Sequence, residues 1–320
     1  MNGSPNAMMP DSLKTFTGGV FHYTSSTGLL GSLRSGSVWA SAASSLNDLG
    51  EVRQGWALIQ KLFAAEPSSP VVDMLKRLAD DPLKREHEVF VLSASTDGDD
   101  ANQWRLYADE GRGYAVELDA SVALAAVSEV PDPSPAKGTR IGTLARNIAA
   151  VSPWHKVLYQ ESEVDTAIQE LIAAATAEDA SIASTAGMPQ EARDAAYDAL
   201  QDDVYEALAT IAHLIKSSGF AGENEVRVVA TLVWGEEHIR YRAAANGIVG
   251  YATLAAAPGG PRRTVLRPAA TGLSVVTTLP IKSVRLGPLL RPEHENTMKA
   301  FLRSLHLKGV TIKASTVPLR

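Results

Sequence analysis

The 320-residue sequence contains no cysteine. This absence excludes disulfide bonds, a thiolate nucleophile and the cysteine-rich class of zinc sites. No apolar run reaches the roughly 18 to 20 residues of a membrane-spanning helix. The first residues also lack the basic segment followed by an apolar one that marks a signal peptide. We therefore expect a cytoplasmic protein without a membrane partner.

Several strong catalytic signatures are also missing. The sequence has no G-x-x-x-x-G-K-[ST] phosphate loop, no H-E-x-x-H zinc helix and no G-x-S-x-G nucleophile elbow. Its seven histidines are scattered without an i, i+4 pair, so we expect no metal cofactor. The net charge of −6 argues against binding of nucleic acid through the overall field, but it leaves room for a local basic patch.

The content of the sequence is that of an ordinary globular chain, with 45% hydrophobic and 21% charged residues. Strand-like and helix-like segments are mixed without strict βα alternation, and the strands of the second half lie close together. Two amphipathic helices, within about 161–218, look like an insertion between strands. We predict an α+β fold: a curved, mostly antiparallel sheet with packed helices and this helical insertion. Residues 1–17 are expected to be a disordered leader, and 18–320 a single domain.

A histidine and a threonine share one face of the first predicted strand, 20–25. Side chains alternate along a strand, so His22 and Thr24 face one side, while Phe21 and Tyr23 face the other. The pair would suit a ribose diol or an amide. The alternative is a capped strand end with a satisfied, partly buried histidine.

A second group of polar residues lies in the segment GENEVRVV. In the predicted strand, 223–234, Glu223, Glu225 and Arg227 share a face. The other face carries Val226, Val228 and Ala230, which should pack in the core. A carboxylate placed there could accept a hydrogen bond from a substrate hydroxyl or stabilise a developing cation, with Arg227 orienting Glu225. The alternative is a solvated face with cross-strand ion pairs.

A third group follows the predicted strand 88–95. Ser93 and Ser95 share a face of that strand, and Gln103 or Trp104 lies one turn from Tyr107 on the next helix. The rings of Trp104 and Tyr107 could form a wall for a planar ligand or could anchor the helix to the core. A fourth group, Asn47, Asp48 and Glu51, could bind a ligand or cap a helix.

These pieces together resemble the bacterial DUF2971 family, a domain of unknown function. The resemblance rests on their order along the chain and spans about residues 20–320, apart from the insertion and about 258–272. It is carried by FHYTSSTGLLGSLRSGSVWASAASSLNDLGE, VLSASTDGDDANQWRLYADEGRGYAVEL, ENEVRVV, YR…NGIVGYATL, LPIKSVRLGP and ASTVPLR.

A more distant resemblance is to ADP-ribosyltransferases of the diphtheria-toxin and poly-ADP-ribose type, whose NAD site begins with a strand carrying H-x-T. That resemblance implies that His22 contacts ribose hydroxyls and that Thr24 helps to seat the nicotinamide. It implies a stacking ring from Tyr107 or Trp104 and a ribose-binding, cation-stabilising role for Glu225. It also implies that Glu223 activates an acceptor, as in the Glu-x-Glu pair of arginine-modifying transferases. Arg227 and Ser93 complete the predicted NAD-binding set.

Three functional hypotheses follow. The first is an NAD-consuming enzyme, either an ADP-ribosyltransferase with an unknown acceptor or an NAD glycohydrolase, in a bacterial toxin or anti-phage defence role. The second is a nuclease or phosphotransfer enzyme whose cleft is lined by arginines. The third is a non-enzymatic sensor or partner-binding module that uses the helical insertion. The first requires His22 and Glu225 to project into one pocket from neighbouring strands, and it fails if they lie on opposite faces of the sheet. The arginines of the second are Arg227, Arg240, Arg242, Arg262 and Arg263.

Overall fold

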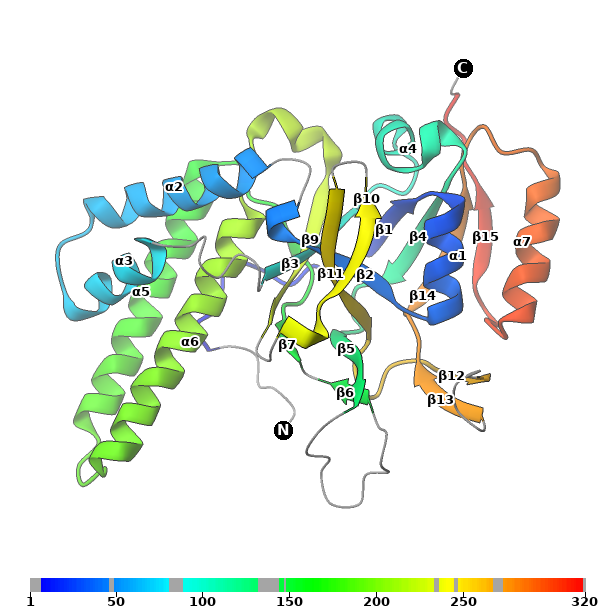
Figure 1. The fold of residues 1–320 in the computed structure, drawn as a ribbon. Helices are drawn as coiled ribbons and strands as arrows, with labels where there is room; N and C mark the ends of the chain where they lie inside the picture. Colours follow the sequence, from blue (N-terminus) through cyan, green and yellow to red (C-terminus); the bar gives the residue numbers. More distant parts are fainter. Residues whose placement is uncertain are drawn as a thin grey trace.

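The computed structural model has an α+β fold built on one large, open, mostly antiparallel sheet (Figure 1). It describes residues 7–45, 49–80, 89–131, 144–146, 148–232, 236–244, 247–266 and 273–318. Within these ranges the main sheet has 13 strands, and a separate two-stranded sheet pairs β12 with β13. The predicted fold class is confirmed.

The strands follow the predicted segments closely where β-branched residues dominate. Their bounds are β1 (Gly19–Thr24), β2 (Val38–Ala42), β3 (Val89–Ser95), β4 (Tyr114–Asp119), β5 (Leu124–Pro131), β6 (Leu144–Arg146), β7 (Ala149–Val151), β8 (His155–Lys156), β9 (Glu225–Leu232), β10 (Arg240–Ala244), β11 (Gly247–Ala256), β12 (Arg262–Leu266), β13 (Leu273–Thr277), β14 (Ile281–Leu286) and β15 (Thr311–Ala314). Pairing is antiparallel throughout except between β14 and β15, which run parallel.

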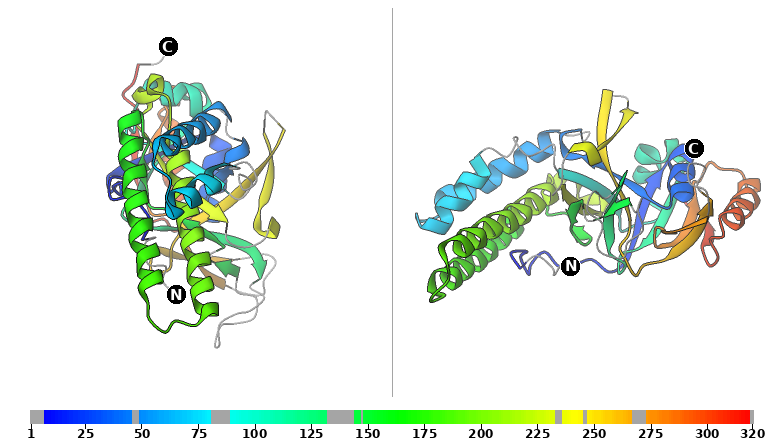
Figure 2. Two further views of the ribbon diagram at one scale, coloured as in Figure 1. Left: turned by 90° about the vertical axis from the view of Figure 1, so that its left-hand side faces the viewer. Right: turned by 60° about the horizontal axis from the view of Figure 1, so that its bottom comes forward.

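The helices form two groups on either side of the sheet's middle (Figures 1 and 2). They are α1 (Ser26–Ser35), α2 (Leu49–Ala65), α3 (Pro70–Asp80), α4 (Ala101–Tyr107), α5 (Glu161–Ser184), α6 (Gln190–Leu214) and α7 (Glu293–Ser304). The first group comprises α2, α3, α5 and α6, which share one apolar core. The long α5–α6 hairpin is the predicted helical insertion, and α2 and α3 pack on it. In the other group, α1 and α7 contribute Leu29, Leu33, Met298 and Leu302 to the core of the sheet.

The sheet branches at β3. One edge of β3 pairs with β9 along its whole length, from Val89↔Thr231 to Ser95↔Glu225. Two strands share the other edge. β1 pairs with it only at Phe21↔Ser95, and β2 pairs at Ser41↔Val91 and Ala42↔Phe90. The middle of that edge therefore lies between two diverging strands.

The predicted leader is partly built into the domain. Met8 and Leu13 are buried in the core of the helical group, and the Phe16 backbone N–H donates to Trp154 O at 2.7 Å. Burial of two large apolar side chains and this backbone bond fix the segment. The expectation of a disordered leader is thus wrong for residues 7–17.

Candidate functional site

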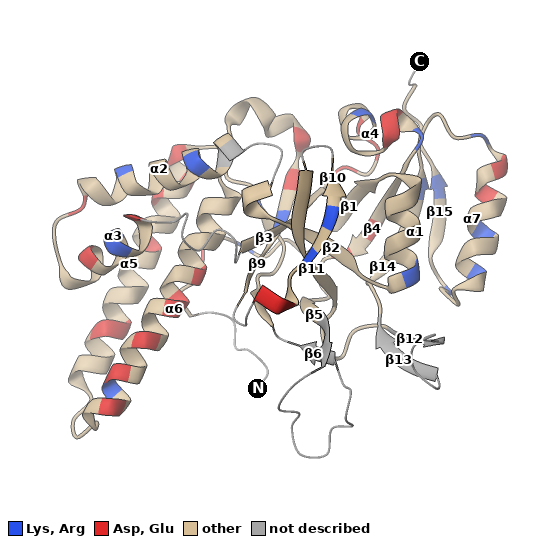
Figure 3. Cartoon of the chain, in the orientation of Figure 1, with Lys and Arg blue, Asp and Glu red and all other residues tan. Residues whose placement is uncertain are grey.

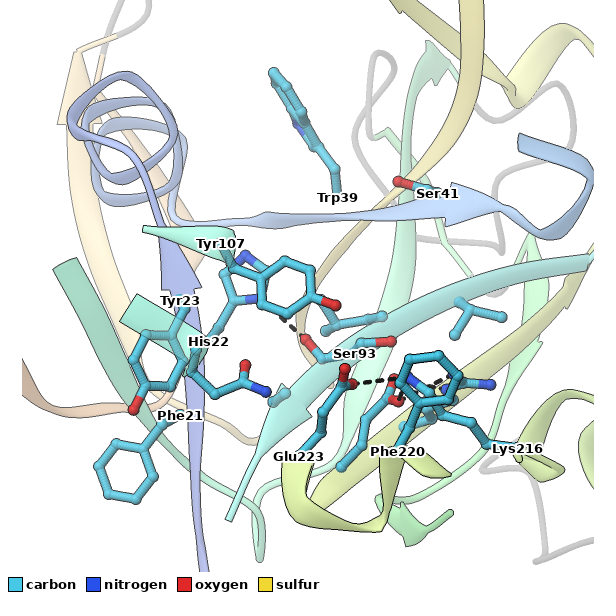
Figure 4. Close-up of a pocket in the computed structure, with 16 residues that line it drawn as sticks. Phe21, His22, Tyr23, Trp39, Ser41, Ser93, Tyr107, Lys216, Phe220 and Glu223 are labelled. Carbon is cyan, nitrogen blue, oxygen red and sulfur yellow. Dashed lines mark hydrogen bonds and ion pairs between the residues drawn. The ribbon is translucent and has the colours of Figure 1, made fainter. Parts of the chain in front are cut away.

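A cavity of about 440 Å³ lies where β1 and β2 diverge along the edge of β3 (Figure 4). Its volume falls within the usual range of small-molecule sites. Side chains from the strands, from α4 and from the segment after α6 enclose it. The lining residues are Phe21, His22, Tyr23, Trp39, Ser41, Val91, Leu92, Ser93, Ala94, Gln103, Tyr107, Lys216, Phe220, Glu223, Glu225 and Arg227.

His22 reaches across the opening between β1 and β3. Its Nδ1 lies 3.1 Å from the Ser93 carbonyl oxygen, and because a carbonyl only accepts, Nδ1 carries the hydrogen. Burial lowers the pKa of His22, against the opposing effect of this hydrogen bond. The ring is therefore neutral near pH 7, and Nε2 is an acceptor.

The strand register places His22 and Glu225 on different sides of the ladder. Phe21 pairs with Ser95, and Ser95 pairs with Glu225, so these three share a face and His22 takes the other. Both nevertheless line the same cavity. Because β1 leaves β3 after Phe21, the sheet is open at this point and side chains from either face can reach the gap. The condition of a single pocket is therefore met, but the condition that His22 and Glu225 share a face of the sheet is not.

Glu225 is held in a buried network of charges. Arg227 donates to it twice, from Nε to Oε1 at 2.7 Å and from Nη2 to Oε2 at 3.0 Å, and Lys216 Nζ lies 2.8 Å from Oε2. Burial by itself would raise the pKa of Glu225, but the charges and hydrogen bonds of Arg227 and Lys216 outweigh it and lower the pKa to about 2. Glu225 is thus a permanent anion with both oxygens engaged. Arg227 orients it, as the sequence predicts.

The sequence predicted that Glu223 lies on the same strand as Glu225, and this prediction is wrong. Glu223 ends a short 3-10 helix, η4 (Ser218–Glu223), and Asn224 then takes a left-handed conformation with φ of 48° before β9 begins. This turn aims the Glu223 side chain at the cavity from its own direction (Figure 4). Its Oε2 pairs with Lys216 at 2.7 Å. Its Oε1 receives no hydrogen bond from any residue in the described ranges, so one carboxylate oxygen is available to a ligand.

Lys216 is the site residue that the sequence reasoning missed. It follows the C-terminal end of α6, is buried, and bridges Glu223 and Glu225. Its ammonium group also lies 5.0 Å from the centre of the Phe220 ring. A lone lysine after an apolar helix end, a few residues before ENE, is the signal that could have pointed to it.

The two candidate stacking rings have different positions. Tyr107 lines the cavity and is 43% exposed. Trp104 is fully buried and packs edge-on against Tyr23 with centroids 4.8 Å apart, while its Nε1 donates to Asp99. Trp104 therefore anchors α4 to β1, and Tyr107 is the ring that a ligand could reach.

Of the other predicted residues, some line the cavity and some do not. Ser93 lines the cavity and supplies the carbonyl that holds His22. Thr24 is not among the lining residues. Its Oγ1 packs so close to Gly28 that a Cβ at Gly28 would lie 2.1 Å from it, which links the end of β1 to α1. Asn47 and Asp48 lie outside the described residues, as does the side chain of Glu51.

Three further lining residues were not predicted as site residues. Gln103 reaches the cavity from α4, and Trp39 and Ser41 reach it from β2. Trp39 is 44% exposed, whereas the residues before and after it in β2 are buried. The tryptophan in the short predicted strand VWAS is the signal that could have pointed to this part of the site.

Within the described residues, none of the helices has the length and apolar character of a membrane-spanning segment. No group of three or more histidine, aspartate or glutamate side chains in those ranges is placed to hold a metal ion.

The fold and the cavity define a class of protein: an α+β chain with a branched sheet and a polar, aromatic-lined site at the branch. Residues 103–228 match the model of a family described as a protein of unknown function (DUF2971). No curated protein and no solved structure matches the chain. The predicted resemblance to this family is confirmed over that segment, which carries Tyr107, Lys216, Glu223, Glu225 and Arg227. The resemblance to ADP-ribosyltransferases stays a prediction.

Proposed function

We propose that the chain is an NAD-consuming enzyme, either transferring ADP-ribose to an acceptor or hydrolysing NAD. The observation that carries the proposal is that His22, Tyr107 and two carboxylates line one cavity at the branch of the sheet. A neutral histidine acceptor, an accessible ring and an anion are the groups that a nicotinamide riboside would require. Charged and aromatic side chains beside His22 also favour an enzyme over a passive partner-binding module.

The chemistry needs few groups. Breakage of the bond between the nicotinamide nitrogen and C1′ of the ribose sends both electrons to the nitrogen and leaves positive charge on the ribose. A nucleophile, either water or an acceptor group, then bonds to C1′ and loses a proton. Stabilising the cation and holding the ribose in place are the main tasks of the protein.

Glu223 is the carboxylate that we assign to the substrate. Both oxygens of Glu225 are committed to Arg227 and Lys216, whereas Oε1 of Glu223 is open to a ribose hydroxyl. In this assignment His22 Nε2 accepts from a second hydroxyl, and Tyr107 stacks on the nicotinamide. Glu225 and Arg227 are positioning residues, because they hold Lys216 and through it Glu223.

The test is nicotinamide release from NAD by the purified chain. Glu223→Gln keeps the shape of the side chain and leaves Lys216 paired with Glu225, so the variant should fold and lose activity by a factor of about 100 or more. Glu110→Gln changes an exposed carboxylate outside the cavity and should match the wild type. A folded Glu223→Gln protein with wild-type activity, or a wild-type protein that leaves NAD intact, would refute the proposal.

A further inference from the structure

The face of the sheet beside the cavity carries an aromatic pair in which Trp39 is exposed and Tyr251 is half-buried. The rings of Trp39 on β2 and Tyr251 on β11 lie 4.6 Å apart at an angle of 33°. The Arg242 guanidinium carbon lies 5.8 Å from the centre of the Trp39 ring, and its Nη2 donates to Ser41 Oγ at 3.1 Å. We call Trp39, Tyr251 and Arg242 the platform.

The register makes the platform continuous with the cavity. A single cross-strand row runs through Val229, Val91, Ser41, Tyr251 and Arg240, because each is paired with the next. Paired residues share a face of the sheet. The platform is therefore on the same face as Glu225 and Arg227. Trp39 belongs to both, since it also lines the cavity, and Ser41, which accepts from Arg242, is a further lining residue.

We propose that the platform binds the adenine ring and pyrophosphate of the dinucleotide whose nicotinamide end occupies the cavity. This inference rests on the proposed function and extends it to the second half of the substrate. An exposed tryptophan offers a stacking surface for a base, and stacking on aromatic side chains is a main source of nucleotide affinity. Arg242, already fixed between Trp39 and Ser41, supplies a positive charge for the pyrophosphate.

The charge distribution favours one dinucleotide over a nucleic-acid strand. A polymer needs several cations along its path, and the described side chains of β10 provide Arg240 and Arg242. The chain has a net charge of −6, and acidic side chains are conspicuous along α5 and α6, whereas β10 is marked by basic ones (Figure 3). This pattern suits a short ligand with two phosphates.

The geometry also suits a ligand that extends from one end of the site to the other. Figure 4 shows Trp39 standing on β2 at one side of the cavity, with Glu223, Phe220 and Lys216 grouped at the opposite side. A ligand whose two rings are joined by a ribose–pyrophosphate–ribose linker would place one ring at each side. The linker would then pass Ser41 and Ser93.

The experiment measures binding of AMP and of nicotinamide mononucleotide separately, by calorimetry. Trp39→Ala should weaken AMP binding at least about fivefold and weaken the binding of nicotinamide mononucleotide by a clearly smaller factor. Trp39→Phe should retain part of the AMP affinity, because a ring remains. The matched control is Tyr241→Ala, which removes an aromatic ring that is 64% exposed on the other face of the same hairpin.

The outcomes separate this inference from the proposed function. If AMP binds the Trp39→Ala variant as tightly as it binds the wild type, or does not bind the wild type, the platform assignment is wrong. If a short single-stranded oligonucleotide binds the platform far more tightly than AMP, with steep salt dependence, the assignment to a dinucleotide is also wrong. AMP binding that depends on Trp39, in a protein that neither binds nicotinamide mononucleotide nor cleaves NAD, would uphold the platform while refuting the enzyme.

Discussion

At the scale of single residues, the defining feature is the cluster of Lys216, Glu223, Glu225 and Arg227. Two anions and two cations are withdrawn from water together, and each has a partner within 3.0 Å. An isolated buried charge is costly, so such a group is tolerated only when its partners are present. Arg227 is tied further by a bond from Nη1 to His213 O at 2.7 Å. The cluster thereby joins the end of α6 to β9.

Removing one cation from this cluster should be strongly destabilising. Lys216→Met should lower the free energy of unfolding by about 3–5 kcal/mol, because Glu223, whose side chain is 14% exposed, loses the cation that it pairs with and Glu225 keeps Arg227 alone. Urea denaturation followed by circular dichroism would measure this loss.

The matched control is Lys61→Met. Lys61 also forms a 2.7 Å pair, with Glu161, but the two side chains are 67% and 55% exposed. Its loss should cost less than about 1 kcal/mol. Equal losses in the two variants would show that the buried cluster contributes no more than a surface pair.

At the scale of the elements, α2 and α6 cross at Gly55. A Cβ at this position would lie 2.5 Å from the Ala212 carbonyl oxygen, which belongs to the backbone of α6 and cannot move aside easily. Gly55 thus allows the helices of the first group to approach closely. The helical insertion is joined to the earlier part of the chain through this contact.

Gly55→Ala should therefore lower the midpoint of thermal unfolding, in spite of alanine's higher helix propensity. Gly31→Ala is the control, since Gly31 lies within α1 and a Cβ there meets nothing within 4 Å. That change should stabilise the protein by up to about 1 kcal/mol. A Gly55→Ala midpoint at or above the wild-type value would contradict the close crossing.

Most elements could be predicted from the sequence because their periodicity is local. The apolar stripes of α5 and α6 predict helices, and the run of β-branched residues in β9 predicts a strand. The start of β9 after Asn224 could not be predicted, because the sequence ENE fits a continuous strand as well as a turn in which Asn224 is left-handed. The segment before Gly18 was misjudged because Met8 and Leu13 find their apolar partners far along the chain, in the helical group.

The sequence predicted many of the residues that line the site, but it did not predict how they contact one another. Alternation separates His22 from Tyr23, but it does not reveal which neighbour covers each side chain. Thr24 meets Gly28 and Trp104 meets Tyr23 because of packing that depends on the whole fold. Lys216 was missed because it pairs with carboxylates through the turn after α6, where no helical or strand period applies.

At the scale of the whole molecule, the cavity lies where the sheet branches and the two helical groups meet it. The branch leaves the middle of one β3 edge between β1 and β2. α4 and the segment after α6 then close the opening from opposite sides, with Tyr107 and Phe220. A site made from so many separate parts of the chain depends on the complete fold. A segment covering 103–228 alone would lack His22 and Trp39.

The most direct measurement is a crystal structure of the Glu223→Gln variant grown with NAD. We expect the nicotinamide ring beside Tyr107, with its ribose within hydrogen-bonding distance of His22 Nε2 and of the side chain at position 223. NAD bound elsewhere on the chain, or a cavity that stays free of it at saturating concentration, would contradict the assignment of this cavity as the substrate site.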